Sequence, residues 1–283
     1  MGESEERGER AWRISIHLLA IAMTVKHISS ADNAHYKQLK KIASSARERR
    51  KSAHTLLDGV HLLNALAEAG GRAELIVLKA ASQNDVEIQQ CLKRCPDVPQ
   101  LVFSDVLFDA LSPVEHPTGV LALCTIPHAA PSRREFCVLL EAIQDPGNLG
   151  AMLRTAAAAG VDTVYLSKGC AEAWSPKALR AGMGAQFSLA VIEHADLIAI
   201  ARELKTLVAT SLDATQSIYD LDLTGLVAFV FGNEGAGLSA ELLNAATHQI
   251  KIPMPGKVES LNVAAAAAVC LFECVRQRGV KLR

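Results

Sequence analysis

Residues 250–278, IKIPMPGKVESLNVAAAAAVCLFECVRQR, contain the pattern that decides the fold of this 283-residue chain. A short apolar run at residues 250–254 is followed by a turn rich in proline and glycine and then by an alanine-rich apolar segment. This order predicts a strand, a tight loop and a buried helix. Ser260 or Asn262 is expected near the helix N-cap, where a short oxygen-bearing side chain accepts a free backbone N–H. Taken alone, the stretch is explained equally well as a capped C-terminal helix.

Two earlier stretches have the same order of strand, glycine turn and helix. Residues 136–143 are an apolar strand that meets the turn Asp-Pro-Gly-Asn at residues 145–148, and a helix is predicted from about residue 149 to 159. The second stretch, VAFVFGNEGAGLSAELL, occupies residues 227–243. Further strand-like runs alternate with helical patterns, which predicts an α/β fold with a mostly parallel sheet covered by helices on both faces. Ligands bind such sheets at the carboxyl ends of the strands, where all three turns lie.

The three blocks together resemble the SpoU/TrmH branch of the SPOUT superfamily, RNA ribose 2'-O-methyltransferases that use S-adenosylmethionine. The resemblance extends over about residues 136–278, within an expected catalytic domain at residues 135–283. It implies a SPOUT-type knotted fold with a trefoil knot near the C-terminus, and a homodimer whose active sites are built across two subunits. Physical reasoning alone does not predict a knot, because chain connections are normally unknotted.

The resemblance also implies roles for individual residues. The polar side chains with expected catalytic roles are Asn148, Arg154, Glu234, Ser260 and Asn262. The residues expected to contact the cofactor, largely through backbone and apolar surface, are Gly232, Ile252 and Leu261, with Thr210 and Met254 as weaker candidates. Ordinary structural roles are open for several of them. Ile252 and Leu261 fit a hydrophobic core, and a glutamate at residue 234 fits the start of a helix.

Arg154 has been cast as the catalytic base in this family. Arginine, however, keeps its proton at neutral pH. We expect Arg154 to bind a phosphate next to the target ribose bidentately and to stabilise the developing alkoxide, with proton loss direct or phosphate-assisted. The alternative is a solvated surface arginine on an otherwise apolar helix.

The sequence pattern of residues 25–125 predicts a separate small α/β domain. Residues 56–69 and 86–93 have helical periodicity, and residues 75–78 and 100–103 are strand-like. The basic segment near its start, LLDGV at residues 56–60 and HPTGVLA at residues 116–122 resemble the L30e-like substrate-binding domain that precedes many SpoU catalytic domains. Asp58 stands where that family more often has Glu.

A basic helix is expected within residues 33–51. Its seven cations are Lys37, Lys40, Lys41, Arg47, Arg49, Arg50 and Lys51. Phosphate neutralisation by Lys and Arg gives RNA affinity that is independent of sequence, so RNA binding is the favoured interpretation and a solvated helix face the alternative. Few aromatic residues occur nearby, so base stacking is not indicated.

The remaining features set limits on the class of protein. Residues 1–24 are expected to be a poorly ordered extension, and residues 126–134, with two prolines and paired arginines, a linker. The formal net charge of −1 gives no overall field that would attract nucleic acid. The seven cysteines have no metal-ligand spacing, so we expect buried thiols, no metal and a reducing cytoplasm. No apolar run is long enough to span a membrane.

Three functional hypotheses follow. The first is an active homodimeric RNA ribose methyltransferase, with ribosomal RNA slightly favoured over transfer RNA as the substrate. The second is a catalytically silent RNA-binding protein of the same fold, although such a protein would be expected to lose Arg154 or Asn262. The third is an unrelated nucleotide-binding α/β enzyme, although the chain has neither a dinucleotide-binding fingerprint nor a Walker motif. Gly182 stands where the resembled pattern usually has Ser, which weakens any assignment of the RNA substrate.

Overall fold

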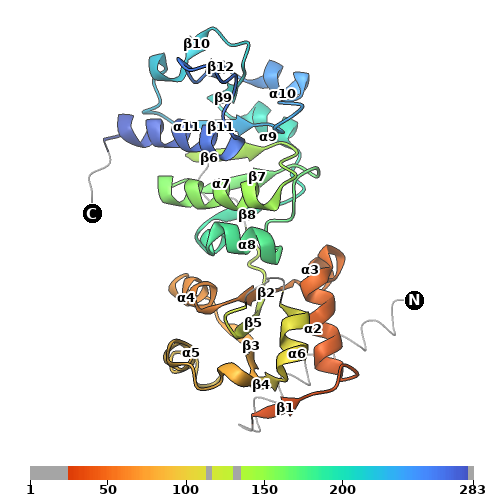
Figure 1. Ribbon diagram of the computed structural model, residues 1–283. Helices are drawn as coiled ribbons and strands as arrows, with labels where there is room; N and C mark the ends of the chain where they lie inside the picture. The colour runs from red at the N-terminus through yellow and green to blue at the C-terminus, as the bar shows by residue number, and fades with distance from the viewer. Residues whose placement is uncertain (1–24, 113–116, 130–134, 280–283) are drawn as a thin grey trace. The chain divides into compact units, whose positions relative to one another are not determined.

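The computed structural model describes residues 25–112, 117–129 and 135–279 (Figure 1). The chain divides into two compact units, each with its own sheet. The N-terminal unit comprises residues up to 127 together with 174–176, and the C-terminal unit comprises 128–173 and 177–283. The expected extension at 1–24 and residues 130–134 of the expected linker lie outside the described residues.

The N-terminal unit has a five-stranded mixed sheet in the order β1-β4-β3-β5-β2. Strands β1, β4 and β3 are parallel, and β5 pairs antiparallel with both β3 and β2. The strands are β1 (Lys26–Ile28), β2 (His54–Asp58), β3 (Ala73–Lys79), β4 (Gln100–Phe103) and β5 (Val120–Thr125). The helices are α2 (Ala34–Ser44), α3 (Ala46–Ser52), α4 (Val60–Glu68), η1 (Ala80–Ser82), α5 (Val86–Leu92) and α6 (Asp105–Leu111).

The helix expected at residues 56–69 is wrong in its first part. Residues 56–58 belong to β2, and α4 begins only at Val60. Leu56 and Leu57 are both buried because the strand is covered on both faces, and a fully buried strand shows no alternation that distinguishes it from a helix. The expectation of a single basic helix is also wrong, because the segment forms two helices, α2 and α3. Ser45 has extended dihedrals, and its side chain caps α3 by accepting the Glu48 N–H.

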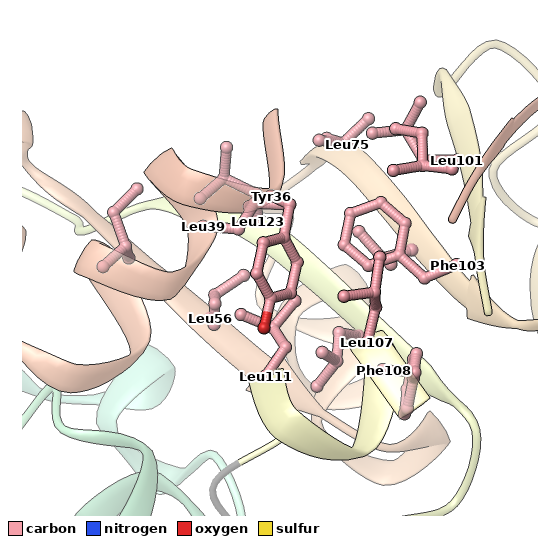
Figure 2. Close-up of a cluster of buried hydrophobic side chains, with 14 residues drawn as sticks. Tyr36, Leu39, Leu56, Leu75, Leu101, Phe103, Leu107, Phe108, Leu111 and Leu123 are labelled. Atoms are coloured by element: carbon pink, nitrogen blue, oxygen red, sulfur yellow. The ribbon is translucent and has the colours of Figure 1, made fainter. Parts of the chain in front are cut away.

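The core of the N-terminal unit lies between its sheet and the helices α2 and α6. Figure 2 shows Tyr36 of α2 beside Phe103 of β4, with their ring centroids 5.8 Å apart. Phe108 of α6 fills the same cluster and is completely buried. Burial of each such side chain contributes about 1.5–3 kcal/mol, so this cluster fixes α2 on the sheet.

The C-terminal unit has a seven-stranded sheet in the order β10-β12-β9-β11-β6-β7-β8, and every pairing in it is parallel. This confirms the expected α/β fold with a mostly parallel sheet. The strands are β6 (Phe136–Leu140), β7 (Thr163–Leu166), β8 (Ala190–Ile192), β9 (Leu207–Thr210), β10 (Gln216–Ser217), β11 (Val227–Phe231) and β12 (His248–Lys251). β8 and β10 were not expected, because runs of three and two residues carry no periodicity.

Helices cover both faces of this sheet (Figure 1). α9 and α10 pack on the face that presents Cys137, Tyr165 and Val230, while α7 and α11 pack against each other and α11 contacts β11. The helices are α7 (Pro146–Ala159), α8 (Pro176–Gly182), η2 (Ala185–Ser188), α9 (Leu197–Glu203), η3 (Ile218–Asp220), α10 (Ala240–Ala245) and α11 (Val263–Gln277). The trefoil knot remains a prediction, as does the L30e-like character of the N-terminal unit.

All seven cysteines are free, and Cys270 and Cys274 are buried in α11. Burial raises the pKa of Cys270 to about 12, so its thiol stays protonated at neutral pH and packs as a small apolar side chain. Among the described residues, no group of three or more His, Cys, Asp or Glu side chains could hold a metal ion. Within the same residues, no helix has the length and apolar character needed to cross a membrane.

Candidate active site

A cleft of about 400 Å³ opens at the carboxyl ends of β9, β11 and β12, which are neighbours in the sheet. Parallel strands that lie side by side bring the loops after them to one edge, so segments distant in sequence meet there. The cleft is lined by every residue expected to contact the cofactor: Thr210, Gly232, Ile252, Met254 and Leu261. Glu234 and Ser260 of the expected catalytic set line it as well.

One wall of the cleft is the loop between β11 and α10, and it consists largely of backbone. The loop folds back on itself through paired backbone hydrogen bonds between Asn233 and Gly237, of 3.1 and 2.9 Å. A Cβ atom at Gly232 would lie 2.3 Å from the carbonyl oxygen of Gly237, closer than any real contact. Only glycine therefore fits at residue 232, and the resulting wall lets a nucleoside approach the backbone closely, as the expected cofactor requires.

A chain of three polar side chains joins the three sequence motifs beside this cleft. Asn148 donates a hydrogen bond from Nδ2 to Oε1 of Glu234. Asn262 donates from Nδ2 to Oδ1 of Asn148 at 3.0 Å, while its own Oδ1 accepts the Ala264 N–H at 2.9 Å and so caps α11. Of the two N-cap candidates, Asn262 is thus the N-cap. We call this chain the Glu234–Asn148–Asn262 network.

Asn148 lies in the first turn of α7 and not in the turn before it. The helix begins at Pro146 because proline fits the first helical position and Asp145 accepts the Asn148 N–H at 2.8 Å. That N–H holds the pKa of the Asp145 carboxyl below its ordinary value, and Lys177, with Nζ 3.4 Å from Oδ2, acts in the same direction. Asp145 therefore caps the helix as a carboxylate, and the Asn148 side chain remains for the network.

Arg154 lies apart from the network. It is six residues beyond Asn148 on α7, about 9 Å along the helix axis, and its side chain is exposed. In the described parts of the chain its side chain has no hydrogen bond or ion pair, and Arg154 does not line the cleft. Ser260 lines the cleft and is exposed, without a side-chain hydrogen bond among these residues. The structure thus brings four of the five residues with expected catalytic roles to the cleft and its network.

The seven cations expected to bind RNA fall into two groups. Six are exposed on α2 and α3, and we call them the basic surface: Lys37, Lys40, Lys41, Arg47, Arg50 and Lys51. Arg49 is only 4% exposed and donates from Nη1 to the carbonyl oxygens of Ile42 and Ala43, at 2.6 and 2.9 Å. Because these carbonyls lie at the C-terminal end of α2, Arg49 stabilises a helix end and does not belong to the basic surface.

Sequence reasoning missed two residues that organise the cleft. Asn233 forms hydrogen bonds within the β11–α10 loop and to Ala142, which lies between β6 and α7. Glu141, directly after β6, accepts the Ser239 N–H at 2.7 Å. An asparagine followed two residues later by a glycine is typical of a turn closed by an asparagine side chain, and this signal was present at residues 233–235. No sequence signal indicated Glu141.

A cleft at the carboxyl edge of a parallel α/β sheet is where such folds commonly bind nucleotide-type cofactors. Residues 135–272 match the sequence model of the SpoU rRNA Methylase family. The chain is 35% identical over 262 residues to an uncharacterized tRNA/rRNA methyltransferase of Synechocystis sp., covering 90% of this chain and 95% of that protein. It is 32% identical over 255 residues to the 23S rRNA (guanosine(2553)-2'-O)-methyltransferase RlmP of Bacillus subtilis, covering 88% and 98%.

A solved structure indicates the same family as these relatives. The SpoU methyltransferase AviRb from Streptomyces viridochromogenes, in complex with AdoMet, superposes with a TM-score of 0.75 at 26% identity, covering 87% of this chain and 99% of AviRb. The chain therefore belongs to the SpoU rRNA methylase family. The expected family, enzyme class and cofactor are thereby confirmed: the protein is a methyltransferase that uses S-adenosylmethionine.

Proposed function

We propose that this protein methylates a ribose 2'-hydroxyl in ribosomal RNA. The observation that carries the proposal is the Glu234–Asn148–Asn262 network, which lies beside a cleft lined by all five residues expected to contact the cofactor. The RNA substrate is supported by RlmP of Bacillus subtilis, whose name specifies 2'-O-methylation of a guanosine in 23S rRNA. The complete network argues against the catalytically silent alternative.

The residues of the chain divide the chemistry between them. S-adenosylmethionine would supply an electrophilic methyl group to the ribose 2'-oxygen, whose proton would pass to water or to a neighbouring phosphate. The backbone wall at Gly232 and the apolar side chains of Ile252 and Leu261 would hold the adenosine end. Glu234 binds Asn148 through Oε1, which leaves Oε2 to accept a hydrogen bond from the substrate. Arg154 binds the neighbouring phosphate and stabilises the charge that develops on the oxygen.

We infer further that the enzyme is a homodimer in which Arg154 of one protomer acts at the cleft of the other. Arg154 is exposed and does not line its own protomer's cleft, and α7, which carries it, packs beside α11. α11 exposes an apolar side chain, Phe272, at 47%. The proposed shared site would place α7 and α11 at the contact between two copies of the chain, and the exposed Phe272 is compatible with that contact.

Mixing two variants, each impaired in a different half of the site, tests this arrangement. Purified Arg154→Ala and Gly232→Ala proteins are mixed, allowed to exchange subunits and assayed at a cofactor concentration too low to occupy the Gly232→Ala cleft. They should regain about a quarter of the wild-type activity, because half of the dimers then contain one intact composite site. Light scattering should give a mass near twice the chain mass of 30.2 kDa. A stable, active monomer, or no recovery after demonstrated exchange, would contradict the shared site.

We propose that the N-terminal unit, residues 25–125, captures RNA through the basic surface. Replacing Lys40, Arg47 and Arg50 with alanine should weaken RNA binding and reduce the slope of log affinity against log salt by about 0.7–0.9 for each lost phosphate contact. Filter binding over a range of salt concentrations measures both quantities. S-adenosylmethionine affinity should not change.

The matched control for the basic surface removes three exposed cations elsewhere in the same unit, Arg72, Lys93 and Arg94. If those substitutions weaken RNA binding as strongly, the effect comes from overall charge and not from α2 and α3. Arg49→Ala serves a second purpose. It should lower the thermal unfolding temperature with little effect on the salt slope, because Arg49 holds the end of α2.

The reaction itself is tested by mapping ribose methylation across all RNAs in cells with and without the gene, using protection of the 2'-modified linkage from alkaline cleavage. Loss of protection at a site in ribosomal RNA is expected. Loss only in transfer RNA would overturn the substrate. An unchanged map, together with no transfer of labelled methyl by purified protein to unmodified RNA, would support a silent RNA-binding protein.

We infer a cytoplasmic location from the proposed substrate and from the cysteines. Ribosomal RNA is modified where ribosomes are assembled, and all seven cysteines of the chain are free thiols. A reducing compartment keeps such thiols in this state.

A further inference from the structure

Asn233 has its side chain almost entirely occupied by contacts within the protein. Its Oδ1 accepts the N–H groups of Gly235 and Ala236, at 2.9 and 3.1 Å. Its Nδ2 donates to the carbonyl oxygen of Ala142 at 3.0 Å. An asparagine side chain offers two acceptor lone pairs and two N–H donors, so only one N–H remains for any ligand. Although Asn233 lines the cleft, its contacts indicate a role in shaping the loop.

The bond to Ala142 joins the β11–α10 loop, which carries Glu234, to the segment that leads into α7. Ala142 lies between β6 and α7, the helix that carries Asn148, and it has a left-handed backbone with φ of 54°. That conformation is unfavourable for alanine and persists only where neighbours hold it. Its N–H is bound by Ser167 Oγ at 2.9 Å, and its carbonyl is bound by Asn233. The connection into α7 is thus held from both sides.

Glu234 directly follows Asn233, so the turn that the Asn233 side chain holds sets the direction of the Glu234 side chain. The Asn233 side chain closes a turn around Glu234 by binding the next two N–H groups, and it ties this turn to the segment that precedes α7. Glu234 then meets Asn148 on α7. Two segments, 86 residues apart in sequence at Asn148 and Glu234, are thereby held in one relative position.

We propose that Asn233 is a positioning residue for methyl transfer, which fixes Glu234 against Asn148 by tying the β11–α10 loop to Ala142. The proposal rests on the proposed function of the network. The Asn233 side chain thus has two tasks. The bonds that it accepts from Gly235 and Ala236 shape the cofactor wall, and the bond that it donates to Ala142 aligns the catalytic side chains.

The variants Asn233→Asp and Asn233→Ala separate these tasks. Aspartate keeps an oxygen that accepts the Gly235 and Ala236 N–H groups, but it places a second oxygen against the Ala142 carbonyl in place of the donor. We expect kcat to fall about 100-fold, the cost of a misplacement near 1 Å, while the S-adenosylmethionine Kd changes less than about threefold. Alanine loses both sets of bonds, so Kd should rise about tenfold as well.

Asn244→Asp is the matched control, because Asn244 is an exposed residue of α10 and the substitution adds the same charge to the same unit. It should leave kcat and Kd unchanged. Wild-type kcat in Asn233→Asp would overturn the proposal. A Kd that rises in step with the loss of kcat would overturn it too, since Asn233 would then act by binding the cofactor.

A readout that does not depend on activity keeps this inference distinct from the proposed function. Amide hydrogen exchange at Gly235 and Ala236 should stay slow in Asn233→Asp and become fast in Asn233→Ala, because only the aspartate retains the acceptor. Exchange that is the same in wild type and both variants would overturn the role of Asn233 in the loop. If wild-type protein transfers no methyl group, the proposed function fails while this exchange pattern still stands.

Discussion

Replacing Arg154 with alanine is expected to lower kcat for RNA methylation by about 1,000-fold and to change the S-adenosylmethionine Kd by less than about threefold. A cationic donor directed at a developing oxyanion is worth about 100- to 1,000-fold in rate, and the bidentate phosphate contact is lost with it. The S-adenosylmethionine affinity should hardly change, because Arg154 does not line the cleft of its own protomer. Single-turnover transfer of labelled methyl and calorimetric titration of the cofactor measure the two quantities.

The control for Arg154 is Arg202→Ala. Arg202 is an exposed arginine on α9, which packs on the other face of the sheet from α7, so its removal takes away the same charge far from the network. It should retain full activity. Turnover within threefold of wild type in Arg154→Ala would remove Arg154 from the chemistry, and an equal loss in both variants would attribute the effect to net charge.

Gly232→Ala is expected to weaken S-adenosylmethionine binding by about 100-fold. The new Cβ would lie 2.3 Å from the Gly237 carbonyl oxygen, and the obstacle is backbone held by the paired bonds between Asn233 and Gly237. The loop must therefore open into the cleft, at a cost of about 1–3 kcal/mol. Calorimetry or equilibrium dialysis with labelled cofactor measures the affinity.

Gly225→Ala is the matched control for Gly232, since a Cβ at Gly225 meets nothing within 4 Å. Its cofactor affinity and thermal stability should equal those of the wild type. If Gly232→Ala binds the cofactor normally, the wall between β11 and α10 does not contact it, and the assignment of the cleft is wrong.

The fold was predictable where the sequence pattern was long. The strands β6, β7, β9, β11 and β12 were expected within a few residues. β6, β7 and β11 are apolar runs that lead into segments containing glycine or proline. The start of α7 was misplaced by three residues. Pro146 and Gly147 suggested a turn, whereas proline is also well suited to a first helical position once Asp145 provides the cap. Residues 56–58 of β2 were taken for the start of a helix because Leu56 and Leu57, on opposite faces of the strand, are both apolar and buried.

For the site, the sequence predicted only which segments of the chain come together. Resemblance to a family indicated Asn148, Glu234 and Asn262, but their shared hydrogen bonds depend on strand order, which no local pattern encodes. Arg49 illustrates the converse. In the sequence it is one of seven cations in a basic run, and only the break at Ser45 folds α3 back so that its guanidinium reaches Ile42 and Ala43. Charge alone did not distinguish a buried helix cap from a surface cation.

The network has a consequence for the order in which the site forms. Asn262 meets Asn148 across 114 residues of sequence, and contacts this distant form late because a long loop must close first. During translation, α11 leaves the ribosome after every other segment of the site, so a nascent chain can display Asn148 and Glu234 before the residue that completes them has emerged. The network is therefore expected to close only after Asn262 has emerged, so that Asn148 and Glu234 lack their third partner during part of synthesis.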